Sequence, residues 1–322
     1  ILNSELRCMD NSDPKNVEFR DYLKPNNWLI LLLLFIVRII AFLPIKVIQS
    51  LGRIIGYALY FIPSKRKDIA KRNIELCFPD LNEKEQNKLV KKHFVSLGIG
   101  FFEVCIARWK SDKSIAKITH IKGLENLQEA VKKNNGVVLL SAHFTLLEIT
   151  AFIGREAIAP EMPEMVGMYR LGSNPIINRF FRNARLKSVD SLVTKFEVKN
   201  LIKALKEKKI VWYASDQNFI GKNSVNVSFF GQEAPTTPAI CRFVEMTGCT
   251  VLPYFPERLP NGDYVLTVYP EMNNEDCEDP QKFLQDFYEC LESHIVSKKE
   301  QYYWVHRRFK KQESQSDPYV NQ

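Results

Sequence analysis

The sequence predicts an α/β fold with a single, mostly parallel central sheet flanked by helices, preceded by an N-terminal apolar membrane-binding helix. Two observations lead to this prediction. Short buried strand patterns alternate with amphipathic helix patterns from residue 124 to residue 298, which is typical of a sheet covered on both faces. An almost unbroken apolar run also occupies residues 28–43, ahead of that alternation.

The N-terminal part divides into an irregular polar segment, residues 1–25, and an apolar membrane-binding segment, residues 26–62. A spanning helix needs about 20 apolar residues, and Arg38 inside the run would cost about 2.5–3.5 kcal/mol at a helix centre. A polar stripe on one side of the helix instead suits a helix lying in the lipid headgroup layer. The stripe comprises Arg38, Lys46, Gln49, Ser50 and Arg53. A spanning helix, an interfacial helix and a buried hairpin remain open, and the basic cluster at residues 64–67 suits anionic headgroups.

Residues 63–310 are expected to form the α/β domain, and residues 311–322 a mobile polar tail. Residues 67–110 have apolar side chains at helical spacing. Further helices are predicted at residues 124–133, 198–208, 238–245 and 280–298. Buried strands are predicted at residues 137–140, 210–213, 250–255 and 264–269.

The composition narrows the classes of function. The net charge of +8 and the pI near 9.0 favour an anionic partner, whether nucleic acid, acidic lipid or acidic protein. The seven cysteines include no C-x-x-C pair, which indicates free thiols in a reducing compartment and argues against a zinc site. The sequence contains neither the G-x-x-x-x-G-K-[ST] motif nor the G-x-G-x-x-G motif, which argues against nucleotide binding through a glycine-rich loop.

Residues 141–148, Ser-Ala-His-Phe-Thr-Leu-Leu-Glu, lie where a predicted strand gives way to a helix, and sites in open α/β sheets gather at such strand ends. On one continuous helix His143 and Glu148 would lie about 140° apart, so they meet only if His143 precedes the helix. The pair then has the form of a base and its orienter, in which the carboxylate fixes the imidazole tautomer. Because no side-chain nucleophile accompanies them, this favours direct acyl transfer to a substrate hydroxyl.

A structural interpretation stands beside the catalytic one. Thr145-Leu-Leu-Glu148 has the form of a capping box, in which Glu148 only satisfies a helix N terminus. His143 taken alone is equally compatible with a hydrogen-bonded core histidine. Local chemistry leaves both interpretations open.

Five segments, in order along the chain, resemble the late acyltransferases of lipid A assembly, the lauroyl and myristoyl transferases of the larger His-x4-Asp/Glu acyltransferase group. The His-x4-Glu spacing alone is weakly specific. The ordered set is strongly specific and, with the apolar N-terminal segment, covers nearly the whole chain. The segments are Gly123–Leu127 with Gly136–Phe144, Glu148, Met168–Arg170 with Asn174–Pro175, Ile210–Gln217, and Tyr303–Lys310.

The resemblance implies an enzyme at the cytoplasmic face of a bacterial inner membrane, in contact with membrane lipids, with no metal or nucleotide cofactor and no nucleic-acid partner. It implies acyl carrier protein as donor. The implied acceptor is the 3-hydroxyl of a fatty chain on a phosphorylated glucosamine disaccharide bearing Kdo sugars. This chain departs from the family in two places: Asp216-Gln-Asn218 lacks the second acid of an Asp-x-Asp pattern, and residues 184–188 lack an expected glycine.

Basic residues are candidates for binding the phosphates of such an acceptor. Arg170 lies in the Tyr-Arg pair of the resemblance and is expected to stabilise phosphate or oxyanion charge. Arg179, Arg182 and Arg185 recur every three residues, so on a helix they form one face able to fork onto phosphate oxygens; a solvated surface is the alternative. Asp216, directly after a strand, either positions Arg170 or caps a loop.

Two rival functions remain. Acylation of a glycerophospholipid uses the same His-x4-acid site, and a lipid-binding protein without catalysis is the rival from another class, although intact His143 and Glu148 argue against it. Residues 304–308 have the composition of a nucleic-acid patch, but nothing extends the pattern, so we interpret the segment as structural with some lipid contact. His306 has no evident metal partner and is interpreted as structural. Three apolar residues are candidates for an acyl pocket or for core: Phe144, Leu147 and Phe152.

Overall fold

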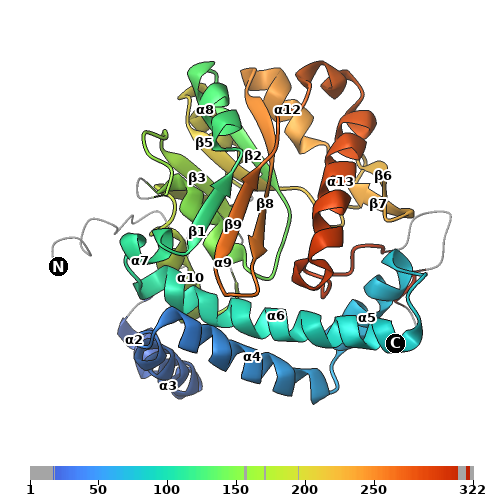
Figure 1. Ribbon diagram of the computed structural model, residues 1–322. Coiled ribbons are helices and arrows are strands. Elements are labelled where there is room, and N and C mark those ends of the chain that lie inside the picture. The colour runs from blue at the N-terminus through green and yellow to red at the C-terminus, as the bar shows by residue number, and fades with distance from the viewer. Residues whose placement is uncertain are drawn as a thin grey trace.

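The structure is a computed structural model that describes residues 17, 19–155, 158–169, 172–194, 196–310 and 317–319. It shows a central sheet with helices on both faces and a long helix, α6, that crosses below the ends of the strands (Figure 1). Arg170 lies outside the described residues.

The central sheet has seven strands in the order β1-β9-β8-β2-β5-β3-β4. All neighbours pair in parallel except β8 and β9, which are antiparallel, so β1 and β9 run opposite to the other five. The predicted α/β class and mostly parallel sheet are therefore confirmed. The seven strands are β1 (Thr119–Lys122), β2 (Val137–Ser141), β3 (Met165–Tyr169), β4 (Ser191–Thr194), β5 (Ile210–Ala214), β8 (Thr250–Arg258) and β9 (Tyr264–Val268).

The sequence of β2 explains its central position. All five of its residues are buried, as expected for a parallel strand covered on both faces. Val138 and Leu140 pack on one face of the sheet, and Val137 and Leu139 on the other. Residues of α11 (Val198–Lys206), α12 (Ala239–Thr247) and α13 (Pro280–Ser297) join the first core, and residues of α8 (Leu124–Lys132) and the 3-10 helix η2 (Ala151–Gly154) join the second.

The other elements lie around this sheet. The strands β6 (Val225–Phe229) and β7 (Gln232–Thr236) form a separate antiparallel hairpin. The pattern at residues 67–110 is two helices, with the second begun by an Asn82 capping box. The remaining helices are α2 (Phe19–Leu23), α3 (Pro25–Ile40), α4 (Ile45–Phe61), α5 (Lys65–Cys77), α6 (Glu83–Trp109), α7 (Asp112–Ala116), α9 (Leu147–Thr150), α10 (Pro175–Arg185), η3 (Asn274–Glu278) and η4 (Lys299–Gln301).

The apolar N-terminal segment is two helices, α3 and α4, separated by a break that ends at Pro44. None of the helices in the described part of the chain is by itself long and apolar enough to cross a membrane. Taken together, α4 and α5 reach that length and composition, but they are bent by 91° at their junction. The large apolar residues of α3 and α4 are nonetheless widely exposed, among them Trp28, Leu32, Phe35 and Ile54.

One face of α4 is packed tightly against α6, next to the sheet (Figure 1). The close approach depends on glycines, since a Cβ added at Gly52 would lie 2.6 Å from the Cα of Ile99. Gln49 of the expected headgroup stripe is buried instead, and its side-chain amide donates to the Gly262 carbonyl at 2.7 Å and to the Tyr264 hydroxyl at 2.9 Å. Its place in that stripe was wrong, because this side of α4 faces the domain.

Tyr319 belongs to the segment expected to form a mobile tail, yet it is buried. Its hydroxyl donates to Oδ1 of Asn73 at 2.5 Å and accepts from the backbone N–H of Phe309 at 3.0 Å. These contacts tie residue 319 to α5 of the domain.

Candidate active site

His143 lies two residues beyond the carboxyl end of β2, in a loop that the C-terminal segment holds in place. The backbone N–H of Thr145 donates to the Gln301 carbonyl at 2.8 Å, and the N–H of Tyr303 donates to the His143 carbonyl at 3.0 Å. Because these backbone hydrogen bonds join the loop to a segment far away in sequence, the fold fixes the position of His143.

The side chain that contacts His143 is Asp216, which lies two residues beyond the carboxyl end of the adjacent strand β5. Its Oδ1 lies 2.6 Å from Nδ1 of His143, and its Oδ2 accepts from the His143 backbone N–H at 2.9 Å and from the Tyr302 hydroxyl at 3.0 Å. The two strands are paired in parallel, Ser141 beside Ala214, so their next residues emerge together. The strand-end position of Asp216 was predicted from the sequence. Its partner was not, because Asp216 was expected either to position Arg170 or to cap a loop.

Charge and burial set the protonation of this pair. Burial lowers the pKa of His143, but the charge of Asp216 and its hydrogen bond outweigh this and raise the pKa above its usual 6.5, with Arg185 opposing. Burial likewise raises the pKa of Asp216, and the charge and hydrogen bonds of His143, with the Tyr302 hydroxyl, lower it to about 2. With Asp216 ionised, Nδ1 of the neutral ring carries the proton.

Glu148 faces a different partner. It lies in α9 and is almost fully buried. Its carboxylate accepts hydrogen bonds from the guanidinium of Arg185, at the end of α10: Nη2 donates to Oε1 at 2.6 Å, and Nε lies 3.2 Å from both oxygens. The expectation that Glu148 orients His143 is therefore corrected: Nδ1 faces Asp216. The capping-box alternative is also wrong, since the Thr145 hydroxyl pairs with Ser96 at 2.7 Å and no side chain caps α9.

His143, Glu148 and Arg185 nevertheless line one pocket of about 200 Å³. The imidazole is about a quarter exposed there, and within the described residues its Nε2 has no hydrogen-bond partner. The other lining residues are mostly apolar. They are Leu147, Thr150, Ala151, Gly167, Met168, Tyr169, Val189, Leu192 and Trp212.

The structure separates the remaining predicted site residues. Arg179 is exposed and donates to the Tyr22 hydroxyl at 3.3 Å, and Arg182 is half-buried and engaged in an interaction of its own. Helix α10 does carry all three arginines of the predicted face. Among the acyl-pocket candidates, Leu147 lines the pocket, whereas Phe144 and Phe152 belong to the core.

The aromatic-basic segment near the C terminus is structural. Arg308 is buried and donates to the Pro235 carbonyl at 2.7 Å and to the Thr236 hydroxyl at 2.6 Å. Nε2 of His306 accepts from the Asn218 backbone N–H at 3.2 Å, and burial lowers the His306 pKa to about 4. In the described part of the chain, no group of three or more His, Cys, Asp or Glu residues is arranged to hold a metal ion.

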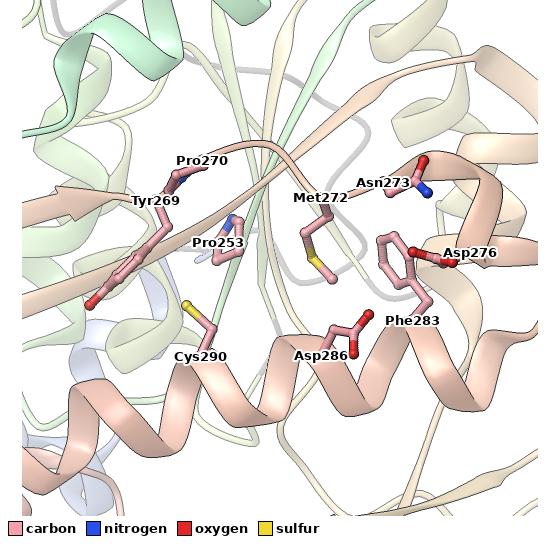
Figure 2. A pocket seen from close by; sticks show the side chains of 9 residues that line it. All are labelled: Pro253, Tyr269, Pro270, Met272, Asn273, Asp276, Phe283, Asp286 and Cys290. Atoms are coloured by element: carbon pink, nitrogen blue, oxygen red, sulfur yellow. The ribbon is translucent and has the colours of Figure 1, made fainter.

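A second cavity of about 200 Å³ lies against α13 and shares no residue with the first (Figure 2). Its side chains converge from α13 and from the segment after β9, including Met272, Asp286 and Cys290. Burial raises the pKa of the Cys290 thiol to about 11, so this thiol is a poor nucleophile near neutral pH. The pocket beside His143 is the better candidate for catalysis.

Comparisons with known proteins identify the family of this chain. The family described as bacterial lipid A biosynthesis acyltransferase matches residues 18–311. The lipid A biosynthesis lauroyltransferase of Escherichia coli K12 is 33% identical over 290 residues, covering 89% of this chain and 93% of the relative. A lipid A biosynthesis acyltransferase of Haemophilus influenzae is 30% identical, covering 92% and 95%, and the E. coli K12 palmitoleoyltransferase is 30% identical, covering 90% and 94%.

Proposed function

The chain belongs to the bacterial lipid A biosynthesis acyltransferases, and from that premise we propose that it transfers a fatty acyl chain from acyl carrier protein to a hydroxyl on the acceptor. The acceptor we propose is a phosphorylated glucosamine disaccharide that carries Kdo sugars and primary fatty chains. The observation that carries the mechanism is the placement of His143: its side chain lines the pocket, Asp216 holds Nδ1, and Nε2 has no hydrogen-bond partner among the described residues.

In this mechanism Nε2 of His143 removes the proton of the acceptor hydroxyl as its oxygen attacks the thioester carbonyl carbon. The Asp216 carboxylate keeps the Nδ1–H tautomer and stabilises the imidazolium that forms. The tetrahedral intermediate then expels the carrier thiolate, which takes the proton from the imidazolium. An ester and a free thiol result, and His143 returns to its neutral state.

Glu148 has a positioning role in this proposal. Its bidentate contact holds the Arg185 guanidinium at the pocket wall, near enough to His143 to oppose the rise in the pKa of the ring. A fixed cation in a partly buried site stabilises developing negative charge. We therefore assign Arg185 to the oxyanion or to an acceptor phosphate, and Glu148 to its orientation.

We retain Arg170, Arg179 and Arg182 as proposed phosphate-binding residues. Two of them lie on α10, the helix that ends at Arg185, so an acceptor whose hydroxyl reaches His143 would carry its headgroup over this helix. Guanidinium groups suit phosphate because they bind it with two parallel hydrogen bonds.

We further propose that the protein lies on the cytoplasmic face of a bacterial inner membrane through α3 and α4. These two helices expose many large apolar side chains, and a large exposed apolar patch is typical of a surface that contacts a membrane or another protein. Cations flank it: Lys67 and Lys91 lie over the rings of Tyr60 and Tyr57 at 4.2 and 4.4 Å. Purified protein should bind vesicles containing anionic lipid, and replacing Leu32 and Phe35 with Ser should release it; unchanged binding would contradict the assignment.

The function is tested by mass spectrometry of the product formed from acyl carrier protein thioester and a tetra-acyl, Kdo-bearing disaccharide. The expected product gains one acyl chain in ester linkage. A lysoglycerophospholipid in a parallel reaction provides the control acceptor. Acylation of that lipid alone would contradict the proposed acceptor while leaving the acyltransferase chemistry intact.

A further inference from the structure

Three residues lie in register across neighbouring strands of the sheet next to the active-site pocket, and the middle one is a glycine. Trp212 of β5 pairs in register with Gly167 of β3, and Gly167 pairs with Leu192 of β4. Trp212 and Leu192 both pack in the core on the α8 side of the sheet. Gly167 therefore leaves a gap between two large side chains on that face.

This gap coincides with the apolar part of the pocket that holds His143. Gly167, Trp212, Leu192 and Val189 all line it, together with Ala151 from η2 on the same side of the sheet. The polar lining side chains, His143, Glu148 and Arg185, come from beyond the carboxyl end of β2 and from α9 and α10. The cavity thus has a reactive part and a hydrocarbon-lined part.

Glycine is not required at residue 167 by the backbone, because its φ is not positive. A Cβ built there would lie 3.2 Å from Cδ2 of Leu192 and 3.7 Å from the methyl groups of Val189. Small side chains are therefore tolerated after a slight shift of Leu192, and they would extend among residues that line the pocket. What the glycine supplies is space.

We propose that the gap at Gly167 receives the distal part of the donor acyl chain and sets the longest chain that the enzyme transfers. This rests on the proposed acyl transfer from a thioester carbonyl held at His143. A hydrocarbon chain suits this part of the cavity because burial of each methylene against apolar side chains is favourable, whereas a sugar or phosphate would lose its hydrogen bonds to water.

Side chains of graded size at residue 167 should shorten the chain that fits. One methylene more or less in an apolar pocket changes selection by roughly tenfold or more. Gly167→Ala should therefore lower transfer of the longest wild-type substrate about tenfold relative to the next shorter one, and Gly167→Val should lower it further. Leu192→Ala should act in the opposite direction and admit longer chains.

The experiment is a competition among acyl carrier protein thioesters whose saturated chains differ in steps of two carbons, with products resolved by mass spectrometry. Val193→Ala is the matched control, because it removes a similar volume from the same strand but packs in the core on the opposite face. We expect shorter products from both Gly167 variants, longer products from Leu192→Ala, and the wild-type distribution from Val193→Ala.

Wild-type distributions from Gly167→Val and Leu192→Ala would overturn the proposal. So would a change in which acceptor acyl species is used while the donor distribution stays fixed, since the gap would then hold an acceptor chain. Thermal melting of each variant checks that it is folded, and Leu192→Ala alone decides the matter if Gly167→Val does not fold. Absence of transfer by the wild-type protein would instead refute the proposed function.

Discussion

The two carboxylates beside the active-site pocket differ in what they bind. Asp216 faces an imidazole, whose charge depends on pH, and accepts from Nδ1, a backbone N–H and a tyrosine hydroxyl. Glu148 faces the guanidinium of Arg185, whose charge is permanent. Asp216 can therefore control the protonation and tautomer of His143, whereas Glu148 can control only where a fixed positive charge lies.

The largest expected effect on activity comes from removing the imidazole of His143. His143→Ala should lower kcat/KM roughly 10²–10⁴-fold, the range for loss of a general base. His143→Ala combined with Asp216→Asn should lose little more than His143→Ala alone, because the pair acts as a unit. His120→Ala, at an exposed histidine, is the control. Additive losses in the double variant would mean that Asp216 acts separately.

Asp216→Asn should be nearly as damaging, up to roughly 10⁴-fold in kcat, because the wrong tautomer becomes available. The acid limb of the rate profile reports the His143 pKa, which Asp216 raises above 6.5. Removing the carboxylate leaves burial dominant, so the limb should move to lower pH even as the maximum rate falls. Steady-state rates across pH measure this, and an unmoved limb would contradict the pairing.

Glu148→Gln should have a smaller effect, about 10–100-fold, the scale of losing a charged hydrogen bond. The acid limb should stay in place, since Glu148 does not contact the ring. Arg185→Lys keeps the charge but loses the fork, so adding Glu148→Gln to it should cost less than Glu148→Gln costs alone. A Glu148→Gln variant with a shifted acid limb would return Glu148 to the role of orienter.

The smallest expected effect is on stability. Because the pKa of Asp216 is lowered on folding, its contribution to stability is fully present above about pH 4. Because the pKa of His143 is raised on folding, its contribution is fully present below about pH 6.5 and is lost as pH rises through the folded-state pKa. Asp216→Asn should therefore lower Tm more at about pH 5.5 than at about pH 8.5. Val193→Ala, an apolar truncation, should lower Tm equally at both, and the same result for Asp216→Asn would contradict this linkage.

Strong local patterns allowed much of the fold to be predicted. The runs that form β2 and β5 are continuous and apolar, and α13 begins at a clear Asp279-Pro280 signal, with the Asp279 side chain accepting from two backbone N–H groups. The short strands β3 and β4 were not predicted, because β3 contains Gly167 and β4 lies at the sheet edge with only Val193 buried. Edge strands lack the continuous apolar run that marks a buried one.

The site was predicted only in part, for a physical reason. His143 was found because its strand end is visible in the sequence. Its partner Asp216 is 73 residues away, and the pairing depends on which strands are neighbours in the sheet. Glu148, at the familiar spacing from His143, is instead held by Arg185, and nothing local reveals that α10 ends beside α9. The packed face of α4 was missed similarly, because the helix it contacts is distant in sequence.

The most direct test of the central claim, that Asp216 and not Glu148 governs His143, is a ¹⁵N NMR titration of histidine-labelled protein, with the signal assigned through His143→Gln. The account predicts that wild-type His143 titrates above 6.5 and that its neutral ring is protonated at Nδ1. Asp216→Asn should lower that pKa, and Glu148→Gln should leave it in place. A pKa lowered by Glu148→Gln and unaffected by Asp216→Asn would contradict the account.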